Sequence, residues 1–191
     1  QPVWAAGVTY QRRHDARRAE SATPHHYDHV YGASRPELFV KALPGTVRGS
    51  GDPVMIRSDS TWDVPEPELA LVLDVRGHIV GLTVGNDMSS RSIEGENPLY
   101  LPQAKVYTGS CVLGPAIVPV AEAPPIADLQ IAMTIRRGGH VAYHQEVRVN
   151  QMRRSPHELA SGRCRAQQLP VGAFLLTGTA LVPPASFTLR R

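Results

Sequence analysis

The fold is decided by residues 65–87, which read PEPELALVLDVRGHIVGLTVGND. Residues 68–75 and 78–84 are two aliphatic runs of strand length, and Asp74-Val75-Arg76-Gly77 lies at their junction. Because such runs form strands and a junction with Asp and Gly favours a turn, the segment predicts a β-hairpin. Similar strand-like runs separated by glycine and proline occur at residues 3–8, 38–41, 54–57, 107–120, 129–136, 141–149 and 175–183.

Helical patterns are fewer than strand patterns. Residues 11–21 form a charged, helix-favouring stretch, residues 89–97 have room for a short helical turn, and residues 152–161 have a start signal at Ser155-Pro156 and a stop at Gly162. Seventeen prolines and sixteen glycines also favour a strand-rich fold with many turns over a helix bundle or a doubly wound sheet. We therefore expect an α+β, β-dominated fold.

The length of 191 residues allows one domain with a sizeable core. We expect residues 1–191 to form a single catalytic domain that is incomplete at both ends, because the chain starts at Gln1 and stops within the strand-like residues 187–191. Residues 9–36 are rich in charged, histidine and tyrosine side chains. We expect this segment to form a mobile lid.

The composition argues against several classes of partner. Twenty basic and seventeen acidic residues give a net charge of +3, which is no large basic surplus. The densest basic run lacks stacking aromatic residues and is interleaved with acids; it comprises Arg12, Arg13, Arg17 and Arg18 with Asp15 and Glu20. There is no long apolar run, and the two cysteines, Cys111 and Cys164, form no paired motif. We expect no nucleic-acid or membrane partner and a cytoplasmic location.

Three carboxylates at the ends of the hairpin point to a metal site. Glu66 and Glu68 are two residues apart, so in a strand their side chains project from the same face. Asp87 follows the second strand, and Glu68 and Asp87 lie at comparable distances from the turn, so the two can converge. Like charges this close repel each other, and a magnesium-class cation prefers such oxygen ligands. The alternative is a set of solvated surface acids.

Lys105 is the candidate for proton transfer. It lies in a largely uncharged segment, and a lysine near a metal in a partly dry pocket can exchange a proton with a substrate carbon. The alternative is an ordinary surface lysine. The histidines show no zinc-site spacing, and no serine or cysteine has the turn signature of a nucleophile elbow.

Several stretches together resemble the fumarylacetoacetate hydrolase superfamily. The resemblance spans nearly the whole chain and is most specific in residues 85–105, GNDMSSRSIEGENPLYLPQAK, which are similar to the branch of 2-keto-3-deoxy-pentonate (arabinonate/xylonate) dehydratases. The other matching stretches are residues 4–10, 35–39, 65–70 and 176–179.

This resemblance implies a mixed, strand-rich roll of the family's C-terminal domain type, closed around Mg²⁺ (Mn²⁺ or Ca²⁺ being alternatives) in a homodimer. The family's lid often carries His and Glu three residues apart, whereas this chain has His14 with Arg17, and the next acid is Glu20. By resemblance the metal ligands are Glu66, Glu68 and Asp87, the active-site lysine is Lys105, and the substrate-binding residues are Lys41, Arg91, Thr179 and Tyr10. Glu20 is our candidate for the second catalytic residue, with a metal-ordered water as the alternative acid.

The resemblance implies a Mg²⁺-dependent lyase that acts on a small 2-keto acid. It would dehydrate a 2-keto-3-deoxy-pentonate to 2,5-dioxopentanoate through a metal-stabilised enolate, with Lys105 moving the C3 proton and Glu20 assisting departure of the C4 hydroxyl. One alternative is a hydrolase or decarboxylase of an acylpyruvate-type diketo acid. Another is a non-catalytic, degenerate relative that binds metal and keto acid.

Overall fold

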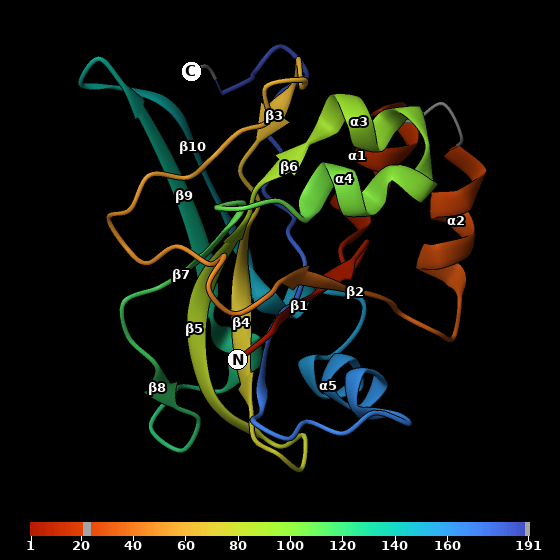
Figure 1. The fold of residues 1–191 in the computed structure, drawn as a ribbon, viewed down its shortest axis with the longest axis vertical. Coiled ribbons are helices and arrows are strands. Elements are labelled where there is room, and N and C mark those ends of the chain that lie inside the picture. Colours follow the sequence, from red (N-terminus) through yellow and green to blue (C-terminus); the bar gives the residue numbers. More distant parts are fainter. Residues whose placement is uncertain (21–23, 190–191) are drawn as a thin grey trace.

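A curved sheet forms the centre of the computed structural model, which describes residues 1–20 and 24–189 (Figure 1). Its seven strands are β1 (Val3–Gly7), β2 (Glu37–Ala42), β4 (Pro67–Leu73), β5 (Ile79–Asp87), β7 (Cys111–Leu113), β8 (Val118–Pro119) and β11 (Ala173–Leu176). They follow the order β2-β1-β11-β4-β5-β7, with β8 also paired to β5. In this sheet β1 and β11 run parallel, and the other neighbouring strands are antiparallel.

Two smaller strand pairs accompany the sheet. β9 (Gln130–Arg137) and β10 (His140–Arg148) form a long hairpin along one side of the molecule (Figure 1), and β3 (Asp63–Val64) pairs with β6 (Ser89–Ser90). This strand-rich arrangement with few helices confirms the expected α+β, β-dominated roll.

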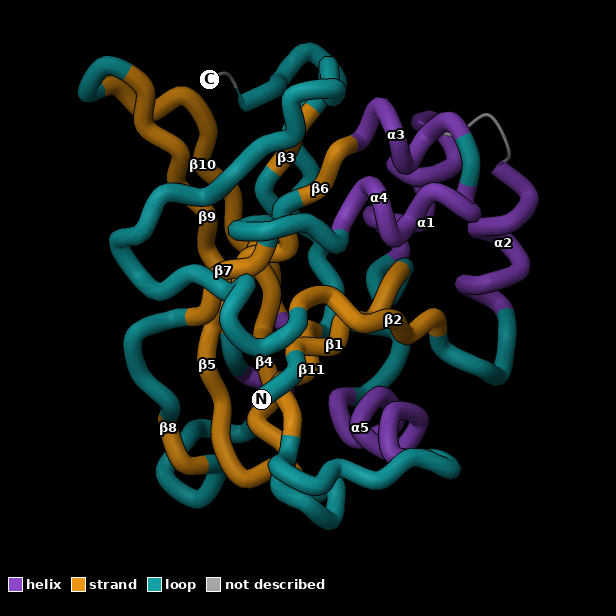
Figure 2. The backbone as a smooth tube through the Cα atoms, in the orientation of Figure 1, coloured by secondary structure: helices purple, strands orange, loops and turns teal. Residues whose placement is uncertain are grey.

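The helices gather in two places (Figure 2). α1 (Gln11–Glu20), α2 (Pro24–Gly32), α3 (Arg91–Glu96) and α4 (Leu101–Lys105) lie together beside one end of the sheet, whereas α5 (Pro156–Cys164) lies apart from them. Short 3-10 turns span Pro98–Tyr100, Ile126–Asp128 and Val149–Gln151. Some side chains of α1 and α2, including that of Glu20, lie outside the described residues. Across residues 1–20 and 24–189, no helix combines the length and apolar character needed to cross a membrane.

The predicted hairpin is β4–β5. Its register places Glu68 opposite Gly85 and Leu71 opposite Leu82. Asp74 closes the turn, because its Oδ1 accepts hydrogen bonds from the backbone N–H groups of Arg76 and His78, both at 2.8 Å. The hairpin therefore returns the end of β5 to the start of β4, as the sequence predicted.

The core follows from alternation along the strands. In β4, Leu69 and Leu71 face a large apolar cluster, whereas Ala70 between them faces a smaller cluster on the other side. The large cluster also contains Leu159 of α5 and Ile131 of β9, so it ties the helix and the long hairpin to the sheet. Burying each such side chain contributes about 1.5–3 kcal/mol.

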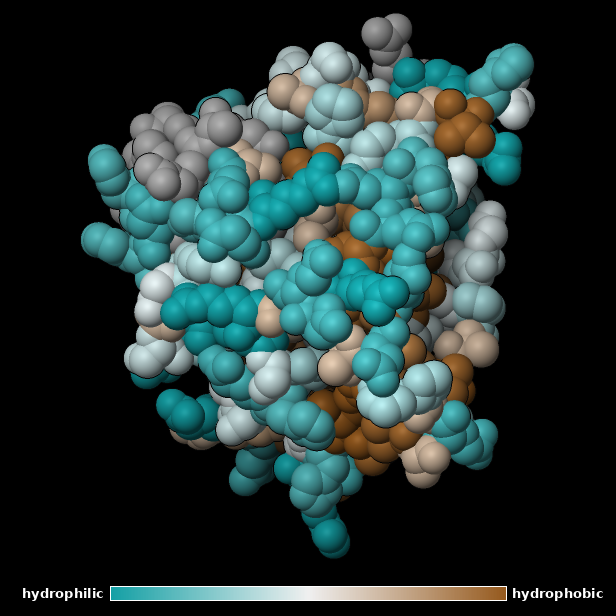
Figure 3. Space-filling view, turned by 180° about the vertical axis from the view of Figure 1, so that it is seen from behind, coloured by the Kyte–Doolittle hydropathy of each residue, from teal (hydrophilic) through white to brown (hydrophobic). Residues whose placement is uncertain are grey.

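Part of the surface is apolar. Figure 3 shows the face seen from behind, where hydrophobic residues are exposed between hydrophilic ones. Four exposed aliphatic residues lie on or beside β5 and β8, with 45–51% of their surface accessible: Val80, Val84, Ile117 and Val118.

Several sequence predictions of elements were confirmed, and some were wrong. α1 matches the predicted helix, but α2 was missed, and residues 54–57 form no strand. α5 continues to Cys164, although a stop was predicted at Gly162. Gly162 lies inside the helix, where the lack of a side chain allows close packing: a Cβ atom there would sit 3.1 Å from Pro36 Cγ. β11 ends at Leu176 rather than near residue 183, because the chain turns at Gly178, whose φ is +90°.

Candidate metal centre

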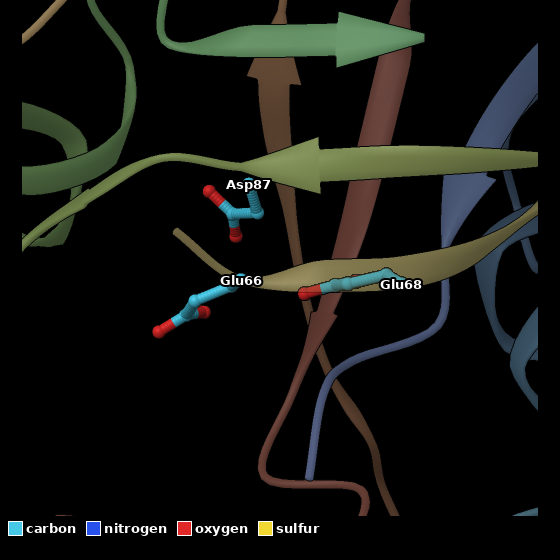
Figure 4. Close-up of side chains that lie close together, drawn as sticks. All are labelled: Glu66, Glu68 and Asp87. Atoms are coloured by element: carbon cyan, nitrogen blue, oxygen red, sulfur yellow. The ribbon is translucent and has the colours of Figure 1, made fainter. Parts of the chain in front are cut away.

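The β4–β5 pair brings three carboxylates together (Figure 4). Glu66 precedes β4, Glu68 lies within it, and Asp87 ends β5. The backbone N–H of Asp87 donates to the carbonyl of Glu66 at 2.9 Å, and the N–H of Glu66 donates to Asn86 Oδ1 at 3.0 Å. One oxygen from each of the three carboxylates lies within 4.8 Å of the others, and all three side chains are buried. The predicted convergence of Glu68 and Asp87 is therefore confirmed.

Burial makes this group of acids electrostatically costly. Burial raises the pKa of Glu68 well above its usual range, and the charges of Asp87 and Glu66 raise it further. Lys105 and the N–H of Gly178 act in the opposite direction. Buried carboxylates with no softer donor among them are the ligand set that a hard divalent cation such as Mg²⁺, Mn²⁺ or Ca²⁺ prefers.

Three cations surround the carboxylates without fully neutralising them. Lys105 Nζ donates to Glu66 Oε2 at 2.8 Å, to Asp87 Oδ2 at 2.9 Å and to Ser89 Oγ at 2.7 Å. Arg91 Nη2 donates to Glu66 Oε1 at 2.6 Å. The buried cluster contains four carboxylates, Glu66, Glu68, Asp87 and Glu94, against three cations, Lys41, Arg91 and Lys105. With all seven groups ionised, one negative charge is left over in this cluster, and a bound divalent cation would offset it and favour the ionised form of Glu68.

Lys41 forms an ion pair with one of the three carboxylates. Its Nζ lies 2.6 Å from Asp87 Oδ1 and donates to the carbonyls of Met88, at 2.9 Å, and Lys105. The side chain is fully buried, and burial lowers its pKa, although Asp87 acts in the opposite direction. Lys41 thus holds Asp87 and the end of α4 in place.

Short helices aim Lys105 at the carboxylates. Ser90 caps α3 by accepting a hydrogen bond from the N–H of Ile93, and Asn97 Oδ1 accepts from the N–H of Leu99 at 2.9 Å. Pro102 occupies the first turn of α4, where its missing N–H costs nothing. Lys105 closes this helix and points back to the hairpin ends.

A cavity of about 250 Å³ opens over the carboxylates. Of the residues named from the sequence, Thr179 and Lys105 line it together with the three acids. Lys41, Arg91 and Tyr10 are buried but do not line it, and the Glu20 side chain lies outside the described residues. The roles assigned to these residues remain predictions.

Three titratable residues of the cavity wall were missed by the sequence reasoning. They are His29 on α2, Glu37 at the start of β2 and Glu94 on α3. A glutamate directly before the apolar run 38–40 was a usable signal for Glu37, and Glu94 lies inside the most specific stretch of the sequence. His29 had no such signal, because α2 was not predicted.

At Gly178 the backbone packs tightly beside the three carboxylates. Its N–H donates to Glu68 Oε2 at 2.6 Å, its φ is +90°, and a Cβ atom there would overlap Thr9 Oγ1 and lie 3.1 Å from the carbonyl oxygen of Ala6. We expect Gly178→Ala to lower the free energy of unfolding by about 3 kcal/mol, measured by urea denaturation.

Gly139→Ala is the matched control, because Gly139 has a φ of +82° but no atom within 4 Å of an added Cβ. It should cost about 1 kcal/mol, the conformational part alone. Equal losses in the two variants would contradict the tight fit at Gly178.

Comparison with known proteins agrees with this geometry. The family model described as fumarylacetoacetate (FAA) hydrolase C-terminal matches residues 3–187. The chain belongs to this family. The resemblance noted in the sequence is thereby confirmed for the family, and the relatives described next confirm the branch to which the chain is similar.

Two curated relatives carry dehydratase names. A "probable 2-keto-3-deoxyxylonate dehydratase" of Haloferax volcanii is 52% identical over 188 residues, which cover 98% of this chain and 65% of that protein. A "2-dehydro-3-deoxy-D-arabinonate dehydratase" of Saccharolobus solfataricus is 43% identical over 185 residues, which cover 95% of this chain and 62% of that protein. The chain thus spans slightly less than two thirds of either relative.

A solved structure of a family member has the same fold. The structure of a 2-keto-3-deoxy-D-arabinonate dehydratase complexed with magnesium and 2,5-dioxopentanoate has a TM-score of 0.90 and 42% sequence identity. The match covers 99% of this chain and 65% of that one.

Proposed function

We propose that the chain carries the active site of a Mg²⁺-dependent dehydratase that converts a 2-keto-3-deoxy-pentonate to 2,5-dioxopentanoate and water. The observation that carries this proposal is the buried trio Glu66, Glu68 and Asp87, with Lys105 hydrogen-bonded to two of its members, in the wall of one cavity. The names of relatives at 52% and 43% identity support the substrate class.

The trio would hold the metal. A bound divalent cation supplies Lewis-acid polarisation of keto-acid oxygens, which acidifies the adjacent C3 position. Arg91 and Lys41 hold Glu66 and Asp87 in position through the ion pairs described above, at 2.6 Å in both cases. Their proposed contribution is to orient ligands, rather than the substrate contact that the resemblance implied.

Lys105 is the proposed proton carrier. Dehydration removes a proton from C3 and the hydroxyl group from C4, the two leave as water, and the C5 carbon becomes the aldehyde after tautomerisation. Lys105 Nζ lies in the cavity wall among Glu66, Asp87 and Ser89, where it can receive or return a proton at the substrate carbon. Thr179 remains the proposed hydrogen-bonding contact and Tyr10 a weaker one. Glu20 remains the proposed acid for the C4 hydroxyl.

Domain organisation, assembly and location complete the proposal. We infer one catalytic domain over residues 1–191, in which residues 9–36, with α1 and α2, act as a lid. We also infer a homodimer, supported by the family resemblance and the exposed aliphatic residues of β5 and β8. Light scattering of the purified protein tests the dimer. We further infer a cytoplasmic location, supported by the free thiols of Cys111 and Cys164.

The reaction is tested by product analysis of the whole protein. We would incubate it with Mg²⁺ and either 2-keto-3-deoxy-arabinonate or an acylpyruvate, and follow the products by mass spectrometry. Loss of the mass of one water from the sugar acid is the expected result. Cleavage or decarboxylation of the acylpyruvate instead would move the function to the rival reactions.

A non-catalytic relative would behave differently again. If neither compound is turned over, and Mg²⁺ and pyruvate together do not raise the thermal stability, the chain is a degenerate relative that binds neither metal nor keto acid. Stabilisation by the pair without turnover of either compound would identify a binding protein. Both results contradict the dehydratase.

Gly7→Ala tests whether the position of Glu37 matters for turnover. A Cβ atom at Gly7 would overlap the Glu37 carboxylate, which must then leave its place on the cavity wall. Because a flexible side chain can move, we expect the free energy of unfolding to change by less than about 1 kcal/mol. We expect kcat/KM to fall by about tenfold or more, since cavity geometry is perturbed.

Gly49→Ala is the control for this substitution, because Gly49 is exposed and outside the proposed lid, and an added Cβ there meets only Asp52 Oδ2 at 3.5 Å, an ordinary contact. Its kinetics should match those of the unaltered protein. Unchanged kcat/KM in Gly7→Ala would show that the place of the Glu37 carboxylate has no bearing on the reaction.

A further inference from the structure

A second cavity lies beyond the β1–β2 pair from the metal centre. Its volume is about 240 Å³, and its walls come from β1, the start of β2 and the region of α5. Successive residues of β2 divide between the two cavities: Glu37 and Phe39 line the first, whereas Leu38 lines the second. The β1–β2 pair, which lies between α4 and α5 in Figure 1, therefore forms a shared wall.

The second cavity is lined by an excess of positive charge. Arg35, Arg163 and Arg165 line it, and Glu158 is the acid among the lining residues. Glu158 is already engaged, because its Oε1 pairs with Arg154 Nη1 at 2.6 Å. Among the described residues, no carboxylate forms an ion pair with any of the three lining arginines.

Arg163 is held as a buried cation in this wall. Its exposed fraction is 6%, its guanidinium lies 3.7 Å from the centre of the Trp4 ring, and its Nη1 donates to Gln167 Oε1 at 2.8 Å. Its buried Nε has no hydrogen-bond partner in the described part of the chain. Burial also lowers the pKa of Arg163, which shows that its surroundings disfavour an uncompensated charge.

A fixed guanidinium of this kind is suited to an oxyanion. Stacking on Trp4 limits the freedom of the Arg163 side chain, so little conformational entropy remains to be lost when it binds a ligand. Arginine binds carboxylate and phosphate oxygens through paired, charge-assisted hydrogen bonds. Trp4, Pro36 and Leu38 add apolar surface that can contact an organic body.

We propose that this cavity binds a small oxyanion, with Arg163 as the buried anchor and Arg35 and Arg165 as the exposed arms. The ligand class is a compact metabolite bearing a carboxylate or phosphate group. The proposal does not depend on the dehydratase activity, and the binding needs no metal.

Calorimetric titration of the whole protein tests the site. Inorganic phosphate and pyruvate would be titrated separately at fixed ionic strength, with protein treated with EDTA to remove divalent metal and then dialysed free of EDTA, which is itself a polycarboxylate. Saturable binding of phosphate supports a phosphate-bearing ligand, and saturable binding of pyruvate supports a carboxylate-bearing one. The absence of saturable binding by either anion would overturn the proposal.

The variant Arg35→Gln/Arg165→Gln tests whether the anion binds in this cavity. Both side chains are exposed, so the variant should fold, whereas Arg163→Gln could unfold the packing around Trp4. We expect the double variant to bind the anion at least tenfold more weakly. The control is Arg76→Gln/Arg148→Gln, which removes the same charge from two exposed arginines that do not line the cavity. Equal weakening in the two double variants, or unchanged affinity in the first, would overturn the site.

Discussion

Glu68→Gln is expected to abolish Mg²⁺-dependent turnover while leaving the metal-free protein at least as stable as before. Glu68 is buried beside Asp87 and Glu66, so removing its charge relieves both desolvation and repulsion. The glutamine oxygen can still accept the hydrogen bond from the N–H of Gly178. We expect the free energy of unfolding in EDTA to stay equal or rise by about 1 kcal/mol.

The same substitution removes one proposed ligand of the cation. We expect kcat/KM in Mg²⁺ to fall by about a thousandfold, because metal catalysis supplies several kcal/mol of transition-state stabilisation. Stabilisation of the fold by added Mg²⁺ should also be lost. The measurements are urea unfolding with and without Mg²⁺, and steady-state kinetics. Glu122→Gln, an exposed carboxylate, is the control and should change neither. A Glu68→Gln protein that keeps its turnover and its response to Mg²⁺ would contradict the ligand assignment.

Lys105→Met is expected to have the opposite effects on stability and on the response to Mg²⁺, with a similar loss of turnover. The substitution leaves the buried carboxylates of Glu66 and Asp87 without the ammonium group that now donates to both. Breaking a buried ion pair from one side costs about 3–5 kcal/mol, so the metal-free protein should be clearly destabilised. Added Mg²⁺ should stabilise this variant at least as strongly as the unaltered protein, because one competing cation is gone. Turnover should still fall by about a thousandfold, since the proposed proton carrier is missing.

Lys105→Arg separates the structural role of Lys105 from its chemical role. Arginine keeps a cation beside the two carboxylates but does not release its proton in a protein. We expect unfolding in EDTA close to that of the unaltered protein, with turnover as low as in Lys105→Met. Turnover that survives in Lys105→Arg would assign proton transfer to another group of the cavity.

The sequence was most informative where local pattern and geometry coincide. The β4–β5 hairpin could be predicted because two aliphatic runs flank a turn that Asp74 closes. Glu68 and Asp87 lie at comparable distances from this turn, so their convergence could be predicted as well. Placing Lys105 beside them needed the family resemblance, because the path of the chain from 88 to 105 through α3 and α4 has no comparable periodic signal.

The remaining site depends on contacts that no local pattern encodes. Lys41 lies under Asp87 because β2 pairs with β1, and that pairing decides which side of β2 faces the centre. Residues 54–57 looked like a strand, but within residues 1–20 and 24–189 their backbone makes a single hydrogen bond to another backbone group, from Met55 N–H to the carbonyl of Gly109 at 3.0 Å. α2 and its His29 were missed because the segment has no apolar periodicity and packs mainly on α1.

Anomalous diffraction from crystals of the protein soaked with Mn²⁺ and pyruvate is the most direct test of the metal centre. Mn²⁺ accepts the same oxygen ligands as Mg²⁺ and can be located by its anomalous signal. We expect one ion bound by Glu66, Glu68 and Asp87, with the keto acid completing its ligands and Lys105 facing the methyl carbon. An ion bound elsewhere, or none at this trio at a Mn²⁺ concentration that supports turnover, would contradict this assignment.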